Sequence, residues 1–344
     1  MKGWMSLAWG VPLLLLIGCA TPSPEQPTVP LPRIDGPVTL RVVHAVNPRL
    51  PVMAPEQRQR LLEEAARISR DHFGLEVRFE ERGEIPIAEL FARLPADELE
   101  KRKGLIYDFK GGGGDRERLV QSLLESFDYY GGPLRPRLDY ARPHLAVPLR
   151  EESERGLAEA LVETLLARLA RWRAVTLADG EPLLDAAPYN EWALWDGLGY
   201  GELPWEIVLT NQLMASAEYQ DLDLHPALRG GITVGTTGYS RASRWGTTVM
   251  WSTFPFTEAQ PLLVELRGGE RYTPEEAARL SGAYLAHEIG HQLLHLAHPF
   301  ERPACVMRPV EMLRFRQWYE ALDAEACRVG SGPAMTPGAV KIRY

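Results

Sequence analysis

The stretch from Ala286 to Phe300 contains four histidines and one glutamate among its fifteen residues. Its first part, His287-Glu288-Ile289-Gly290-His291, has the pattern HExxH. On a helix, histidines at i and i+4 lie on one face, where two neutral imidazoles can converge on one metal ion. Glu288 lies about 100° further round the helix, where its carboxylate can accept a proton from a metal-bound water. We therefore expect one catalytic Zn²⁺ ion held by His287 and His291, with Glu288 as the general base.

The residues around this pattern divide into a polar face and an apolar face. In a helical projection, Tyr284, His291 and His295 fall on the same side as His287. The opposite side is formed by four apolar residues, Leu285, Ile289, Leu293 and Leu296. A helix that stacks imidazoles on one face and buries the other is more typical of a metal site than of solvated histidines.

A catalytic zinc site takes a third protein ligand, for which the sequence offers several candidates. In an unbroken helix His295 lies about 12 Å beyond His287, too far for one ion with bonds of about 2 Å to bind both. His295 can be a ligand only if the helix ends before it. His298 precedes Pro299, which disfavours helical geometry, so the chain can turn there and bring the imidazole back over the metal. We expect His298 as the third ligand, with His295 beside the ligands or as the alternative ligand. The remaining alternative is a downstream acid, Glu301 or Glu311.

Local signals place this helix and the strands that must position it. Thr273-Pro274-Glu275-Glu276 is a capping box with proline at the first helical position, so a helix that begins there carries HExxH at its far end. The spacing of Pro55–His72 predicts an earlier helix between two strands, which makes a βαβ unit and hence a parallel sheet. Alternating or β-branched runs predict the strands at Thr39–Val46, Leu75–Glu80, Trp205–Thr210, Gly231–Gly235 and Thr247–Ser252.

The region between residues 84 and 203 has a different character. Helical spacing predicts helices near Pro86–Leu94, Arg116–Phe127 and Glu152–Ala174. The run Gly111–Gly114 lacks the Lys-Ser/Thr of a phosphate loop, so we interpret it as a flexible connection. We expect one folded domain over residues 38–344, with a largely helical insertion over residues 84–203.

The first residues have the features of an exported protein. Lys2 precedes an apolar run that is too short to span a membrane, which predicts a signal peptide over residues 1–18. Leu16-Ile17-Gly18-Cys19 resembles the lipobox of bacterial lipoproteins, in which the cysteine is diacylated on sulfur and becomes the acylated amino terminus. Several acyl chains anchor a protein far more firmly than one. The proline-rich residues 19–37 would form a tether between this lipid and the folded domain.

Charge and cysteine content limit the partners and indicate a crosslink. The formal net charge of −8 excludes the basic footprint of a protein that binds nucleic acid or docks on anionic lipid by charge. Apart from Cys19, the chain has only Cys305 and Cys327. In an oxidising exported compartment these two can form a disulfide, and two buried free thiols are the alternative.

The carboxyl-terminal part of the chain resembles the metzincin clan of zinc endopeptidases. The clan pattern HExxHxxGxxH is matched in its first half by His287, Glu288 and His291. The segment Cys305-Val306-Met307-Arg308-Pro309 resembles the methionine turn that lies beneath the zinc in this clan. Its Cys-Val-Met is similar to that of archaemetzincins.

Two positions depart from the clan pattern. Leu294 stands where the clan has glycine, and Ala297 stands where it has the third histidine. A one-residue insertion in the turn would bring His298 into that role. Archaemetzincins also have four cysteines for a second, structural zinc, whereas only Cys305 and Cys327 follow Cys19 in this chain, so we expect a single zinc ion.

The resemblance implies a fold of the α+β class with an α/β-type first part. It would have a mixed, mostly parallel sheet, an antiparallel edge strand, the active-site helix and a C-terminal helix after the methionine turn at Met307. The edge strand that pairs with an extended substrate would be Gly231–Gly235, and the C-terminal helix would be Val310–Leu322. Tyr319 and His295 are the candidates for stabilising an oxyanion.

These features imply a zinc-dependent metalloendopeptidase that hydrolyses peptide bonds in a peptide or protein substrate at the bacterial cell envelope. A lipid on Cys19 would hold it at a membrane. Ala20 resembles the sorting pattern for the outer membrane, on its periplasmic side, in a bacterium with two membranes. Two alternatives stay open: a non-catalytic binding or scaffold lipoprotein with this fold, which the displaced third histidine favours, and a zinc amidase that acts on cell-wall peptides.

Overall fold

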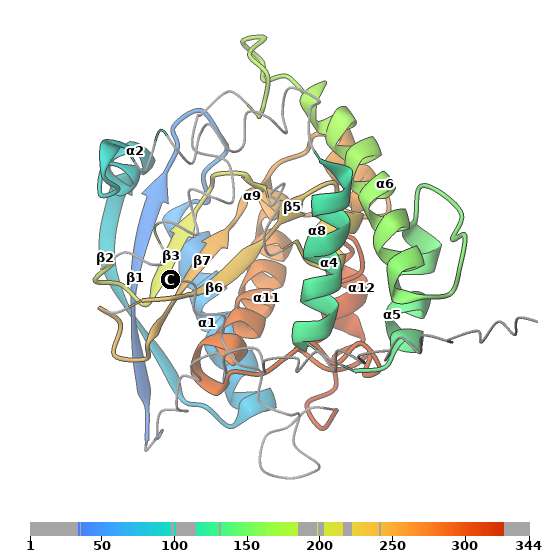
Figure 1. The fold of residues 1–344 in the computed structure, drawn as a ribbon. Helices are drawn as coiled ribbons and strands as arrows, with labels where there is room; N and C mark the ends of the chain where they lie inside the picture. Colours follow the sequence, from blue (N-terminus) through green and yellow to red (C-terminus); the bar gives the residue numbers. More distant parts are fainter. Residues whose placement is uncertain are drawn as a thin grey trace, which may run out of the picture.

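The computed structural model describes residues 34, 36–97, 100, 115–130, 132–184, 198, 203–215, 222–240 and 242–326. The predicted signal peptide, Cys19, most of the tether, Gly111–Gly114 and Cys327 lie outside the described residues. Within them, a five-stranded sheet is packed against helices (Figure 1). None of the described helices combines the length and the apolar character that a membrane span needs.

The sheet is mostly parallel, with one antiparallel strand at its edge. Its strand order is β2-β1-β3-β7-β6, and only β6 runs against its neighbour. The predicted βαβ unit is confirmed, because α1 (Pro55–Phe73) connects the parallel strands β1 and β2. The chain therefore has a mixed fold of the α+β class. The strands are β1 (Val38–Val46), β2 (Val77–Pro86), β3 (Ile207–Thr210), β6 (Gly235–Tyr239) and β7 (Thr247–Ser252).

Alternate residues of the central strands are buried on opposite faces of the sheet. Leu40 and Val42 belong to the larger core, which α1 and the later helices complete. Val43 and Ala45 belong to a smaller core on the other face, together with residues of α2 (Ile87–Phe91). A parallel sheet needs both faces covered, because its strands are apolar on both sides.

The helix that carries HExxH is α11 (Pro274–Leu294), which packs against α1, β6 and β7. The predicted capping box is present. The Thr273 hydroxyl accepts a hydrogen bond from the Glu276 N–H at 3.2 Å, and the Glu276 carboxylate accepts one from the Thr273 N–H at 3.0 Å. Gly282 allows close contact with α1, since a Cβ there would lie 2.2 Å from the carbonyl oxygen of Leu61.

The described residues between β2 and β3 are largely helical, as the sequence predicts. In Figure 1, α4 and α6 lie on the side of α11 that faces away from the sheet. The short helix α8 (Leu224–Leu228) packs against α5 and α6, so the insertion also supports the segment that leads into β6. The helices of the insertion after α2 are α4 (Arg116–Tyr130), α5 (Leu134–Ala141), the 3₁₀ turn η1 (Arg142–His144) and α6 (Glu154–Arg173).

Two predicted elements are wrong in their position or length. Residues Ile232–Thr233 form β5, which pairs with β4 (Met214–Ala215) outside the main sheet, and the edge strand begins only at Gly235. Gly230 and Gly231 have φ of 77° and 89°, so the chain turns there and cannot begin the strand.

The predicted C-terminal helix Val310–Leu322 is reduced to α12 (Phe315–Glu320). Met312 has a φ of 55°, a left-handed conformation that interrupts any helix running through it. Two short helices, α9 (Phe254–Thr257) and α10 (Pro261–Leu266), connect β7 to α11.

Candidate metal centre

Three imidazoles converge at the carboxyl end of α11. The Nε2 atoms of His287 and His291 are 3.0 Å apart, and the Nε2 of His298 lies 3.2 Å from the first and 3.0 Å from the second. Among the described residues, this is the one group of three or more potential ligands whose ligand atoms lie within 4.8 Å of one another. The structure thus brings together the three histidines that the sequence predicts as ligands.

The triangle of nitrogens has the size that a metal ion requires. With metal–nitrogen bonds of about 2.0–2.1 Å, ligand nitrogens lie about 3.3 Å apart in a tetrahedral site and about 3.0 Å apart on one face of an octahedral site. The observed separations of 3.0–3.2 Å fall between these values. The three residues therefore fit a divalent metal with at least one open position, and their geometry does not select one element.

Backbone carbonyls orient two of the three rings. The Nδ1 of His287 lies 2.9 Å from the carbonyl oxygen of Val306, and the Nδ1 of His291 contacts that of Leu296. Because a carbonyl oxygen only accepts hydrogen bonds, each Nδ1 must carry the proton. The lone pair of each ring is then on Nε2, which is the atom that faces the other imidazoles.

Burial also keeps the imidazoles neutral. It lowers the pKa of His287 and His298 well below the usual range, and the neighbouring His291 adds to this effect. Burial lowers the pKa of His291 to about 4. A proton competes with a metal for the same nitrogen, so a site that disfavours protonation is prepared for a metal near neutral pH.

The turn after α11 explains why His298 and not His295 joins the pair. His295 adopts a left-handed conformation, with φ of 50° and ψ of 40°, directly after the last helical residue, Leu294. Its N–H donates to the carbonyl of His291, which closes the helix end. The chain therefore leaves the helix three residues before His298. His295 is buried outside the triangle, and its Nε2 has no hydrogen-bond partner among the described residues.

The acids considered as third ligands lie outside the triangle. Glu311 accepts a hydrogen bond from Arg308 at 2.6 Å and lies 3.6 Å from the His144 imidazole. These two partners lower the pKa of Glu311 to about 2. Glu301 is exposed and does not belong to the cluster.

Glu288 is buried next to the triad, with 6% of its surface exposed. The hydroxyl of Thr237 donates to its Oε2 at 2.9 Å. Burial raises the pKa of Glu288 to about 7, and the hydrogen bond from Thr237 opposes this rise. A carboxylate with a pKa near neutrality can both accept and release a proton, which is what a general base requires.

The segment after the triad packs beneath the helix. Met307 is fully buried, and its Sδ would lie 2.4 Å from a Cβ at Gly290, so the methionine contacts the helix backbone between His287 and His291. The Met307 N–H lies 3.3 Å from Cys305 Sγ. Cys305 is disulfide-bonded; Cys327 lies outside the described residues, so the pairing stays a prediction.

Two residues near the triad were not found by sequence reasoning. The His225 ring meets the ring of His298 edge-on, with 5.1 Å between the centroids. Arg229 is 1% exposed, and its Nη2 donates to the Val310 carbonyl at 2.7 Å. Burial lowers the pKa of His225, as it does for His287 and His298, and the charge of Arg229 lowers all three further. No spacing in the sequence links these residues to HExxH, because α8 is brought there only by the packing of the insertion.

The insertion reaches the site through a small cavity beside His298. Its volume is about 20 Å³, enough for roughly one water. The walls come from α4 and α5, from the start of α8 and from the loop after α11, and they include Phe127, Arg137, Leu224 and Phe300. Residues of α4 and α5 thus form part of the surroundings of the third histidine.

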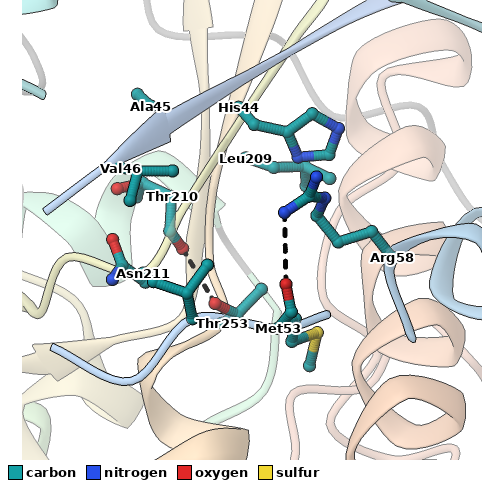
Figure 2. A pocket seen from close by; sticks show the side chains of 10 residues that line it. His44, Ala45, Val46, Met53, Arg58, Leu209, Thr210, Asn211 and Thr253 are labelled. Atoms are coloured by element: carbon teal, nitrogen blue, oxygen red, sulfur yellow. Dashed lines mark hydrogen bonds between the residues drawn. The ribbon is translucent and has the colours of Figure 1, made fainter. Parts of the chain in front are cut away.

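A second cavity of about 20 Å³ lies at the carboxyl ends of β1 and β3 (Figure 2). His44 and Arg58 face it, and the Arg58 guanidinium donates to the Met53 carbonyl at 3.1 Å. The His44 imidazole is paired with Glu81 at 2.9 Å. With room for about one water, this cavity offers no competing ligand site.

Tyr319, the other candidate for stabilising an oxyanion, is engaged elsewhere. Its hydroxyl donates to Glu64 on α1 at 2.7 Å and accepts from Arg67 at 3.1 Å. The structure therefore does not support a role for this hydroxyl at the triad.

Comparisons of the chain with protein-family models, with curated proteins and with solved structures found no match.

Proposed function

We propose that the chain is a zinc-dependent metalloendopeptidase of the metzincin type. The observation that carries this proposal is the convergence of His287, His291 and His298 within 3.2 Å of one another. Glu288, the acid of the HExxH pattern, is buried beside them. Zinc is one of the divalent metals that imidazole ligands bind well. Three protein ligands and an open fourth position are typical of catalytic zinc.

The turn after the helix supports the metzincin assignment. In the pattern HExxHxxGxxH the third histidine follows the glycine by three positions, and glycine is the residue that most often ends a helix in a left-handed conformation. In this chain the left-handed residue is His295, and His298 follows it by three positions. The helix is thus one residue longer than the pattern, while the spacing from turn to ligand is kept.

The fold supports the same assignment. An antiparallel edge strand, β6, lies next to the helix that carries the triad, and Met307 packs beneath that helix. An exposed strand edge can bind an extended peptide through main-chain hydrogen bonds. We propose that the substrate binds along β6, which places a peptide bond near Glu288.

His287, His291 and His298 would hold the zinc. When bound, it supplies Lewis-acid chemistry, polarising the scissile carbonyl and lowering the pKa of the attacking water. Glu288 takes a proton from that water and passes it to the leaving amine. The Thr237 hydroxyl donates a hydrogen bond to Oε2 of the Glu288 carboxylate at 2.9 Å.

The location of the enzyme is a separate proposal. We propose that a lipid on Cys19 tethers it to the bacterial cell envelope, and this rests on the lipobox-like residues 16–19. The proline-rich residues up to position 37 would let the folded domain stand away from the membrane.

The test compares the wild-type chain with Glu288→Gln. We expect both to bind one zinc per chain, because Glu288 is not a ligand, and we expect cleavage of an unfolded protein substrate to fall by about 10²–10⁴-fold in the variant. Glu275→Gln, which changes an exposed acid on the same helix, is the matched control. A wild-type chain without bound metal, or equal cleavage by both forms, contradicts the proposal. Bound zinc with no cleavage by wild type favours the scaffold alternative.

A further inference from the structure

Two residues of the edge strand β6 contact Glu288, the candidate general base. The HExxH pattern does not require these contacts. Residues two positions apart on a strand point to the same face of the sheet. Gly235 and Thr237 are such a pair, and both lie against Glu288. The Thr237 hydroxyl is 2.9 Å from Oε2 of Glu288 and 3.3 Å from its backbone oxygen.

Gly235 provides the space for the Glu288 side chain. A Cβ at this position would lie 2.9 Å from Cγ of Glu288 and 2.6 Å from Cε3 of Trp251. The indole is held in place, because its Nε1 donates to Ser281 at 3.0 Å. A side chain at position 235 would therefore clash with both the Trp251 indole and the Glu288 side chain.

The contacts leave the two carboxylate oxygens in different situations. Oε2 accepts the Thr237 hydrogen bond, whereas Oε1 has no hydrogen-bond partner within the described part of the chain. A glutamate side chain has several rotamers, and a bond to one oxygen reduces their number. The oxygen without a partner is the one available to a water or substrate.

We propose that Thr237 is a positioning residue, which together with Gly235 fixes the Glu288 carboxylate from the substrate-binding strand. This inference rests on the proposed function. A peptide that pairs with β6 lies along the strand that carries Thr237. The same element would therefore orient both the substrate and the base.

The first experiment separates positioning from binding. Thr237→Val removes the hydroxyl and keeps the shape, so we expect kcat to fall by about 10–100-fold because the base is misplaced, while KM stays within about twofold. Thr237→Ser restores the hydroxyl and should recover most of the rate. An unchanged kcat in Thr237→Val, or a raised KM with an unchanged kcat, overturns the proposal.

Failure of the proposed role of Thr237 is distinguishable from failure of the proposed function. If wild type cleaves no peptide, the proposed function fails. If wild type cleaves and Thr237→Val cleaves equally well, only the role of Thr237 fails.

The second experiment needs neither metal nor activity. In the metal-free full chain, Thr237→Val should lower the melting temperature by at least about 2 °C when Glu288 is present, because a buried carboxylate loses its partner. The control is Thr236→Val, which removes a hydroxyl from the opposite face of the strand. In a Glu288→Ala background, Thr237→Val should lower the melting temperature no more than Thr236→Val does. An equal loss in both backgrounds shows that the hydroxyl does not act on Glu288 and overturns the proposal.

Discussion

At the scale of single residues, burial has opposite effects on the two kinds of group in the site. It keeps the imidazoles of His287, His291 and His298 neutral and thus ready for a metal. It also opposes ionisation of Glu288 and raises its pKa to about 7. The metal-free site therefore lowers the free energy of unfolding. A bound cation would offset part of this loss by pairing with the negative charge of Glu288.

The pKa of Glu288 leads to a prediction about stability without metal. Its carboxyl has a pKa of about 7 in the folded chain and an ordinary value of 4.5. The folded state holds this proton more tightly, so the stability of wild type relative to Glu288→Gln should fall as pH rises from 4.5 to about 7. The full change is on the order of 3 kcal/mol. Denaturant unfolding of both proteins in a chelator measures it, and a difference that is independent of pH contradicts the burial argument.

The site residues that lie close together in the sequence were predictable from their spacing. The i, i+4 spacing of His287 and His291 and the position of Glu288 follow from helix geometry. Pro299 predicted a turn at His298, whereas the chain leaves the helix at His295, three residues earlier. The left-handed conformation of His295 was not predicted, because residues other than glycine rarely adopt it. Thr237 was also missed, because its contact with Glu288 joins segments 51 residues apart.

At the scale of elements, two glycines of α11 allow close contact with different neighbours. Gly282 lies against the Leu61 carbonyl of α1, which is rigid backbone. Gly290 lies against the Met307 side chain, which is flexible, and against Phe73. The first contact sets the distance between two helices, whereas the second sets the position of the turn beneath the metal centre.

Alanine at these two positions should therefore have different effects. Gly282→Ala should lower the free energy of unfolding by about 1–3 kcal/mol through overpacking, even though alanine favours helix. Gly290→Ala should cost less stability, because Met307 can move, but should weaken zinc binding by shifting the turn that orients His287. Unfolding and zinc titrations of both variants test this contrast. A Gly282→Ala protein as stable as wild type, or unchanged zinc affinity in Gly290→Ala, would refute it.

Elements with strong local signals were predicted better than those set by packing. The capping box at Thr273 and the strand Thr247–Ser252 were placed correctly. The edge strand was misplaced because Gly235–Tyr239 contains two glycines and lacks an apolar alternation. Its pairing with β7 determines its structure more than its own sequence does.

At the scale of the whole molecule, the helical insertion is hydrogen-bonded to the segments that flank the metal centre. The Tyr140 hydroxyl of α5 donates to the Val310 carbonyl at 2.9 Å, next to the donation from Arg229. The Trp172 indole of α6 donates to the Arg229 carbonyl at 3.1 Å. These bonds join the insertion to the two segments that flank the triad. Helix propensity predicted the helices of the insertion, but not this arrangement, because contacts between distant segments leave no local pattern.

The central claim is that the whole chain folds to place His298, and not His295, with His287 and His291. A zinc titration of the full chain tests it most directly, comparing wild type with His298→Ala and His295→Asn, the latter because asparagine tolerates the left-handed conformation. We predict one zinc per chain in wild type, an affinity reduced by at least about 100-fold in His298→Ala, and a change of less than about tenfold in His295→Asn. Wild-type affinity in His298→Ala, or loss of zinc in His295→Asn, would contradict this account.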